Sequence, residues 1–367
     1  MDINAEFVPG LELNERFYHQ IVREIIASQF PTLDYSAALI GPGSDVLGFD
    51  TPRSRDHDWG LRLQLFLSGP DYQAVGAELD RCLRRSLPKE FMGYPVGWSE
   101  PDLADGGTRQ MEFNGGDEVN HNIRITTIEA YVQSHLGIKP EEDIDIAHWL
   151  SWPEQKLLEF TSGKVFHDGV GQLVSLRERL AYYPQDVWLY RMAAQWMRLS
   201  QEEPFMGRCG ELNDELGSRL IASRLIWDMM RLCFLMERRY APYSKWLGTA
   251  FSTLECGPRL TKNFLKILEA HSWQEREEYL IASYQSLVDM FNELGITPRI
   301  EADIKCFFDR PYRVLYAHRF SEALLEQISD QRLQGKGFIG AVDQFVDATD
   351  VTTDILLCRS IGEIIFR

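Results

Sequence analysis

The sequence predicts an α+β protein, with a small mixed β-sheet and flanking helices over residues 1–170 and an all-α helical bundle over residues 171–367. Three observations lead to this prediction. The chain has 367 residues, which favours two domains over one small core. Short apolar runs and alternating patterns, which are typical of strands, occur only in the first half. From about residue 173, apolar residues recur at helical spacing over long stretches.

Helical and strand-like segments alternate in the first half. Residues 13–29 and residues 71–87 each place their apolar side chains on one helical stripe. Residues 37–40 are a short apolar run that ends at a Gly-Pro-Gly sequence, as expected of a buried strand. Further strands are predicted over residues 94–98, 110–113, 122–128 and 164–167.

The second half is predicted to be helical throughout. Its clearest helices are residues 176–201 and residues 214–240, and the latter is apolar almost all round, as expected of a central bundle helix. Shorter helices are predicted over residues 259–270, 274–295, 311–329 and 339–347.

The net charge and the cysteines indicate which partners and which cellular compartment to expect. The net charge of −17 disfavours general binding to a nucleic-acid backbone or to an anionic membrane. No apolar run is long enough to span a membrane, and the first residues lack the pattern of a signal peptide. The six cysteines are scattered without a C-x-x-C pair, which is typical of free thiols in a reducing compartment. We therefore expect a cytoplasmic protein.

Residues 56–67 carry the most informative pattern, because they alternate with a period of two. Trp59, Leu61 and the leucines that follow share one predicted strand face, and His57 is expected on that buried side. Asp56 and Asp58 share the other face. Two carboxylates at this spacing would lie about 6.6 Å apart and could converge on Mg²⁺ or Mn²⁺. The sequence therefore predicts a divalent-metal site at the start of this strand.

The residues before the two aspartates could bind phosphate. Gly43 allows a close approach of the backbone to a phosphate group, and the Ser44 hydroxyl can donate a hydrogen bond to it. Arg53 and Arg55 could neutralise a leaving pyrophosphate.

This order of a helix, a strand, Gly43-Ser44, a loop and Asp56-x-Asp58 resembles the signature of the nucleotidyltransferase superfamily with the polymerase-β fold. Over nearly the whole chain, the sequence also resembles an uncharacterised bacterial family that pairs such a domain with a helical C-terminal domain. The runs that carry this second resemblance are residues 43–50, 55–60, 183–188 and 240–246. The resemblance implies that the protein transfers a nucleoside monophosphate from a nucleoside triphosphate, with ATP expected, to a hydroxyl-bearing acceptor.

The resemblance also implies roles for individual residues. Ser44 would hold phosphate, Asp56 and Asp58 would hold the metal ion, and a third carboxylate on a neighbouring strand would complete the site. The candidates for that third carboxylate are Glu129 and Glu112. The predicted neighbouring strand carries Arg124 in its middle, which departs from the pattern. A non-catalytic nucleotide-binding or protein-interaction module that retains the fold is therefore the alternative.

Other candidate residues follow the predicted central helix. Tyr243 and Lys245 lie in a segment where cations and aromatic residues alternate, which suits contacts with a nucleotide. Arg313 and His318 match an R-x₄-H pattern that chance readily produces. We expect the partners to be a nucleoside triphosphate and an acceptor that is a small molecule or a protein rather than a nucleic acid. The sequence identifies neither the acceptor nor the oligomeric state.

Overall fold

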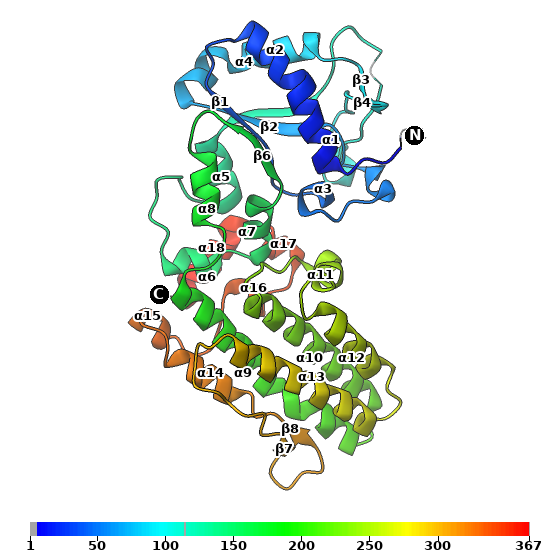
Figure 1. The fold of residues 1–367 in the computed structure, drawn as a ribbon, viewed down its shortest axis with the longest axis vertical. Coiled ribbons are helices and arrows are strands. Elements are labelled where there is room, and N and C mark those ends of the chain that lie inside the picture. The colour runs from blue at the N-terminus through cyan, green and yellow to red at the C-terminus, as the bar shows by residue number, and fades with distance from the viewer. Residues whose placement is uncertain (1–5, 114, 367) are drawn as a thin grey trace. The chain divides into compact units, whose positions relative to one another are not determined.

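The computed structural model describes residues 6–113 and 115–366, and its chain forms two compact units (Figure 1). The first unit contains the chain up to Asp143 together with Lys156–Ala181. The second unit contains Ile144–Gln155 and the chain from Tyr182 onward. The chain therefore passes between the units three times, and the boundary expected after residue 170 falls inside the first unit.

A four-stranded sheet forms the centre of the first unit. Its strands are β1 (Tyr35–Leu39), β2 (Arg62–Leu67), β5 (Asn122–Thr127) and β6 (Lys164–Asp168), in the order β5-β2-β1-β6. Strand β1 runs antiparallel to both β2 and β6, whereas β2 runs parallel to β5. The predicted mixed sheet is confirmed.

Helices cover both faces of this sheet (Figure 1). The leucines of β2 that alternate from Leu63 to Leu67 are buried in one core with Phe17 and Leu83. This core lies beneath α1 (Gly10–Phe17), η1 (Tyr18–Val22), α2 (Arg23–Gln29) and α4 (Gly69–Ser86). On the other face, the ring of Phe66 meets Tyr131 of α5 (Ile128–Leu136) with ring centroids 5.5 Å apart. The alternation predicted within β2 therefore separates two cores.

The first unit also contains short elements that the sequence pattern does not predict. They are α3 (Ser44–Leu47), η2 (Pro52–Asp56), β3 (Glu90–Phe91), η3 (Leu103–Asp105) and most of α7 (Glu154–Thr161). The strand predicted over residues 94–98 is present but short, as β4 (Tyr94–Pro95), and α8 (Leu173–Arg179) overlaps the start of the helix predicted over residues 176–201. The strand predicted over residues 110–113 is reduced to a bridge between Met111 and Trp98.

The second unit is mainly helical. Its long helices are α9 (Gln185–Glu211), α10 (Glu215–Met236), α12 (Gly257–Glu269) and α13 (Trp273–Glu293). Its shorter helices are α6 (Ile146–Ser151), α11 (Ser244–Phe251), α14 (His318–Leu325), α15 (Gln331–Gln334), α16 (Val342–Phe345), α17 (Thr349–Thr352) and α18 (Ile355–Phe366). None of the helices in the described part of the chain is both long and apolar enough to cross a bilayer.

Two predictions for the secondary structure of the helical half are wrong. The unit is not entirely helical, because β7 (Lys305–Cys306) and β8 (Arg313–Val314) pair as antiparallel strands. The single helix predicted over residues 176–201 is divided between α8 and α9. Pro184 is the N-cap of α9 and has an extended backbone with ψ of 151°, so a helix can begin after it but cannot run through it.

Candidate functional site

Three strand ends meet at one edge of the sheet. Strand β1 ends at Leu39, and its antiparallel neighbour β2 begins at Arg62. Strand β5 begins at Asn122, which lies opposite Arg62 in the parallel pair. The connection from β1 to β2 therefore leaves and returns at the same edge. It carries Gly43, Ser44, Asp56 and Asp58.

Arg62 ties the start of β2 to the glycine-containing part of this connection. Its Nη2 atom donates hydrogen bonds to the Asp45 carboxylate at 2.7 Å and to the Pro42 carbonyl at 3.0 Å. The Asp45 side chain is only 1% exposed, so this is a buried ion pair. Gly43 has φ of 137°, and a Cβ atom there would lie 2.3 Å from Arg62 Nη2. Position 43 therefore requires glycine.

Ser44 is half-buried and is the first residue of the one-turn helix α3. The segment that follows it is held by Asp50, whose Oδ2 atom accepts hydrogen bonds from Gly10 N at 2.7 Å and from Trp59 Nε1 at 2.8 Å. These contacts fasten the middle of the connection to α1 and to the core.

The prediction that Asp56 and Asp58 lie on a strand face is wrong. Asp56 ends the 3₁₀-helix η2, Asp58 has a left-handed backbone with φ of 49°, and β2 begins only at Arg62. The left-handed conformation at Asp58 and a second one at Gly60 interrupt the extended backbone. His57 is exposed rather than buried, and so are the two aspartates. The acidic pair thus lies on a surface turn before the strand.

Asp58 is positioned by a residue that the sequence does not single out, Arg109. Asp58 N donates to the Arg109 carbonyl at 2.8 Å, and Arg109 N donates to Asp58 Oδ1 at 3.0 Å. The Arg109 guanidinium also reaches Asn122 at the start of β5, with an Nη1–Oδ1 distance of 3.3 Å. Partial burial lowers the pKa of Arg109 from its usual value. Arg109 therefore joins the acidic turn to the third strand end.

The two candidates for a third carboxylate lie in different places. Glu129 follows the far end of β5, and its carboxylate is 3.9 Å from Lys139 Nζ. The six residues of β5 separate that end from the edge that carries Asp58, a distance of about 17 Å. Glu112 instead follows Met111, which lies against Gly60 and would contact any side chain there. This placement disfavours Glu129 and leaves Glu112, three residues after the Arg109 that contacts Asp58, as the remaining candidate.

The two carboxylates of the acidic turn suit a metal ion whose remaining ligands come from a substrate. No group of three or more His, Cys, Asp or Glu side chains that could hold a metal ion occurs among residues 6–113 and 115–366. Mg²⁺ is commonly bound through one or two carboxylates together with substrate phosphates. The exposed carboxylates of Asp56 and Asp58 fit that mode, with substrate completing the coordination.

The arginines and the aromatic segment predicted to bind nucleotide are divided between the units. Arg53 is exposed on η2, and Arg55 Nε donates to the Pro52 carbonyl at 3.0 Å. Tyr243 and Lys245 belong to the second unit. Lys245 lies over the ring of Trp246 at 5.1 Å, whereas Tyr243 lines a cavity. Of these four candidates, the first unit therefore contains only Arg53 and Arg55.

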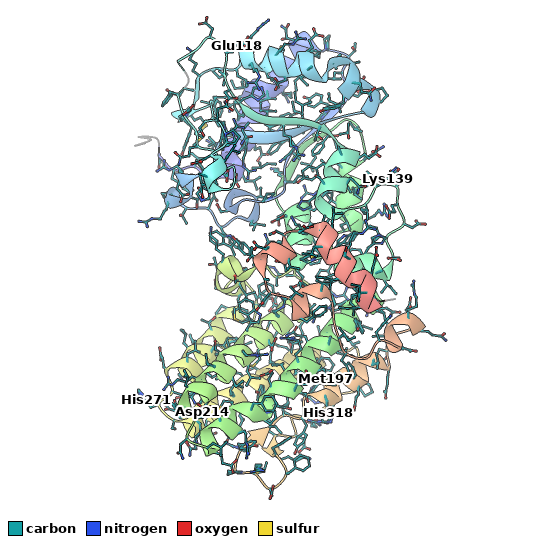
Figure 2. All side chains as sticks on the ribbon, turned by 180° about the vertical axis from the view of Figure 1, so that it is seen from behind. Glu118, Lys139, Met197, Asp214, His271 and His318 are labelled. Atoms are coloured by element: carbon teal, nitrogen blue, oxygen red, sulfur yellow. The ribbon has the colours of Figure 1, made fainter. Side chains whose placement is uncertain are left out.

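The R-x₄-H pattern forms no site in the structure. Arg313 pairs with Glu277 at 2.8 Å and also with Glu278. His318, labelled in Figure 2, is the first residue of α14, and its ring centroid lies 6.1 Å from that of Tyr316. Arg313 is thus occupied in holding β8 to α13.

Comparisons with known proteins give one family and one solved structure. Residues 149–247, less than half of the chain, match a family described as a domain of unknown function, DUF4037. A crystal structure of a nucleotidyltransferase-like protein from Exiguobacterium sibiricum is similar at 12% sequence identity with a TM-score of 0.29. That similarity covers 82% of this chain and 97% of the other. No curated protein matches the chain.

Proposed function

We propose that the first unit is a metal-dependent nucleotidyltransferase. It binds a nucleoside triphosphate, with ATP expected, and transfers the nucleoside monophosphate to a hydroxyl-bearing acceptor. One observation carries this proposal: Gly43-Ser44 and Asp56-x-Asp58 belong to a single connection whose ends meet at one edge of the sheet. The buried contact between Arg62 and Asp45 holds that connection to β2.

Each residue of the connection has a role that its position supports. Asp56 and Asp58 would hold the divalent ion, which neutralises charge on the triphosphate. The Ser44 hydroxyl donates a hydrogen bond to a phosphate oxygen. Arg53 and Arg55 offset the negative charge of the departing pyrophosphate.

The reaction balances as an in-line displacement at the α-phosphorus. The acceptor oxygen forms a bond to that phosphorus, and the bond from the phosphorus to the bridging oxygen breaks. Pyrophosphate leaves with the electron pair of the broken bond. The hydroxyl proton passes to a carboxylate base, and Glu112 is the remaining candidate.

One observation favours the alternative of a non-catalytic nucleotide-binding module. Arg124 is exposed on β5 and pairs in register with Gln64 of β2, where the resemblance calls for a carboxylate. A cation there would still favour a bound anion but could not accept a proton.

Labelling with nucleotides that carry ³²P at the α-phosphate tests the proposal. The full chain is incubated with each labelled triphosphate, Mg²⁺ and a cell lysate as the source of acceptor. We expect label transfer by the wild type and by the control Asp117→Asn, an exposed aspartate of the same unit. Asp58→Asn removes a metal ligand, so its transfer should fall by more than the roughly 10–100-fold typical of outer-shell changes.

Two other outcomes have defined meanings. Mg²⁺-dependent binding of a triphosphate without transfer to any acceptor would support the non-catalytic module. Absence of both binding and transfer with all four nucleotides would overturn the assignment of the Gly43–Asp58 connection as a nucleotide site.

A further inference from the structure

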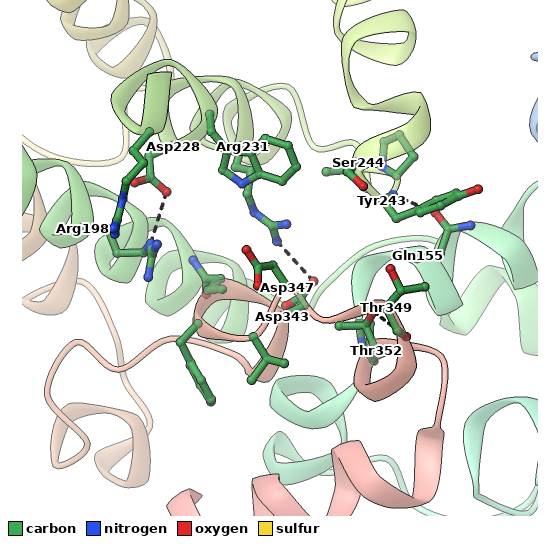
Figure 3. A pocket seen from close by; sticks show the side chains of 18 of the residues that line it. Gln155, Arg198, Asp228, Arg231, Tyr243, Ser244, Asp343, Asp347, Thr349 and Thr352 are labelled. Carbon is green, nitrogen blue, oxygen red and sulfur yellow. Dashed lines mark hydrogen bonds and ion pairs between the residues drawn. The ribbon is translucent and has the colours of Figure 1, made fainter. Parts of the chain in front are cut away.

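A cavity of about 660 Å³ lies entirely within the second unit (Figure 3). Its volume falls in the range of roughly 300–1,000 Å³ that is typical of small-molecule sites. Five separate stretches of the chain line it: residues 153–155, helix α9, helix α10, residues 241–244, and residues 343–352. Most of the lining residues fall within the stretch that matches DUF4037.

Helix α10 supplies one wall through a polar stripe. The stripe consists of Ser223, Arg224, Trp227, Asp228 and Arg231, which all line the cavity. Their spacing of one, three, one and three residues places them on one helical face. The expectation that this helix is apolar almost all round is therefore wrong. Its other side chains fill the bundle core, and this stripe faces the cavity.

Four largely buried charges form an ion cluster at this wall: Glu154 and Arg191 lie behind it, and Arg231 and Asp343 belong to it. Arg191, which is 0% exposed, pairs with Asp343 at 2.9 Å and with Glu154 at 3.4 Å. Arg231 pairs with Glu154 at 3.1 Å and with Asp343 at 3.2 Å. Burial opposes ionisation of Asp343, but Arg191 and Arg231 lower its pKa below the usual value. Arg231 and Asp343, which border the cavity, are thus held in place by ion pairs.

The charges around the cavity are balanced. The wall contains three arginines and three aspartates. Arg198 pairs with Asp228 at 3.2 Å, and Arg224 pairs with Glu202 outside the wall at 2.9 Å. For the Asp347 carboxylate, residues 6–113 and 115–366 offer no hydrogen bond or ion pair. An anionic ligand would therefore meet no net positive charge here, whereas hydroxyl groups would find carboxylate acceptors and guanidinium donors.

Aromatic side chains and hydroxyl groups complete the lining. Tyr243 and Phe345 are 36% and 37% exposed, and Trp227 is half-buried. Figure 3 places Ser244 beside Tyr243, and Thr349 and Thr352 on the wall that also carries Asp343 and Asp347. Flat aromatic surfaces next to fixed polar groups suit a ring with apolar C–H faces and a rim of hydroxyl groups.

We propose that this cavity binds an uncharged ring compound with several adjacent hydroxyl groups. The ring is a sugar, supplied either by a free saccharide or by the ribose of a nucleoside. The ligand's hydroxyl groups donate to Asp347 and accept from the arginines of the wall, and its ring packs against Tyr243 or Trp227. The inference is independent of the proposed nucleotidyl transfer, since every lining residue belongs to the second unit.

Isothermal titration of the full chain tests this inference. EDTA is present throughout, so that metal-dependent nucleotide binding in the first unit does not contribute. The probes are matched pairs: glucose and glucose 6-phosphate, maltose and maltose 1-phosphate, adenosine and AMP, uridine and UMP. We expect at least one uncharged probe to bind and its phosphorylated partner to bind about tenfold or more weakly. Binding of the saccharides or of the nucleosides identifies the source of the ring.

Variants locate the binding in the cavity. Asp347→Ala and Tyr243→Ala alter exposed side chains of the wall and should each weaken binding about tenfold. The matched control is Asp350→Ala, because Asp350 is exposed on the same short helix α17 as Thr349 but does not line the cavity. Asp58→Asn should leave binding unchanged. The inference is overturned if no uncharged probe binds, if phosphorylated probes bind as tightly, or if both wall variants bind like the wild type.

Discussion

The candidate metal site of the first unit and the ion cluster of the second unit place their charged groups in opposite ways. In the first unit, the carboxylates proposed to bind metal, Asp56 and Asp58, are exposed on a turn. In the second unit, the ion cluster is buried beside the cavity. Water screens exposed charges, so they are available to ligands and contribute little to stability. A buried charge that loses its partner lowers the stability of the folded protein, because it is neither solvated nor paired. Substitutions in the first region should therefore change chemistry, and those in the second should change stability.

The largest expected effect on stability comes from the ion cluster. Arg191→Met leaves two buried carboxylates with one arginine between them, and we expect a loss of about 3–5 kcal/mol of unfolding free energy in the second unit. Hydrogen exchange followed by mass spectrometry can measure this loss for each unit. The double variant Arg191→Met/Asp343→Leu restores charge balance and should be more stable than the single variant. Equal stability of the two variants would contradict the electrostatic explanation.

A smaller effect is expected at the buried pair of the first unit. Arg62→Met leaves Asp45 buried without its partner and should cost about 3 kcal/mol, since Arg62 retains some exposure. The variant should also weaken triphosphate binding, because Arg62 holds the Pro42 carbonyl. The control is Arg85→Ala, which breaks an exposed pair with Glu118 (Figure 2) and should cost no more than about 1 kcal/mol. A similar loss in both variants would remove the distinction between buried and exposed pairs.

Acid should affect the two units in opposite directions. Burial lowers the pKa of His121 and of His135 in the first unit to about 4 each. Their unfolded forms take up protons below about pH 6.5 and the folded forms do not, so the first unit loses stability as the pH falls from 7 to 5.

In the second unit, burial raises the pKa of Glu203 to about 7, although hydrogen bonds from Ala317 and Leu315 oppose the rise. The folded form then holds a proton that the unfolded form releases above about pH 4.5, so this residue adds stability as the pH falls from 7 to 5. The expected change is about 2 kcal/mol for each residue. Hydrogen exchange at pH 5 and pH 7 measures both units, and Glu203→Gln should remove the gain in the second. A parallel response of the two units would refute the comparison.

Helix caps should show the smallest effects, and these should be equal in the two units. Ser68 accepts a hydrogen bond from Asp71 N at 3.1 Å, and Ser272 accepts one from Glu275 N at 3.2 Å. Replacing either serine with alanine should cost about 1 kcal/mol in its own unit. Denaturant titration of both variants measures the loss of unfolding free energy. Equal losses would show that local interactions contribute alike in the two units, in contrast to the buried charges.

Local patterns predict part of the fold and of the candidate site. The apolar alternation from Leu61 to Leu67 and the glycine after β1 are visible in the sequence because they depend on neighbouring residues. The turn at Asp58 is not, since Asp58 is held by Arg109, which lies 51 residues away. An alternating pattern thus predicts a strand but cannot locate its first residue.

The second unit illustrates the same limit at longer range. The polar stripe of α10 follows helical spacing and could have been found in the sequence. Its importance depends on Asp343, which is 112 residues from Arg231 and reaches it only in the folded chain. No local pattern links these two charges, so the cavity and the ion cluster could be found only from the structure.

The interleaved path of the chain also determines the order in which the parts of each unit become available during synthesis on the ribosome. The sheet cannot be completed until β6 has emerged, after the segment that carries Glu154 has already been made for the other unit. Glu154, Arg191 and Arg231 are then translated before Asp343, the last member of the ion cluster to be made. During this interval a carboxylate is missing from the forming interior, and a nascent chain released before residue 343 would carry an excess of positive charge there. The ion cluster therefore cannot be complete before residue 343 has been translated.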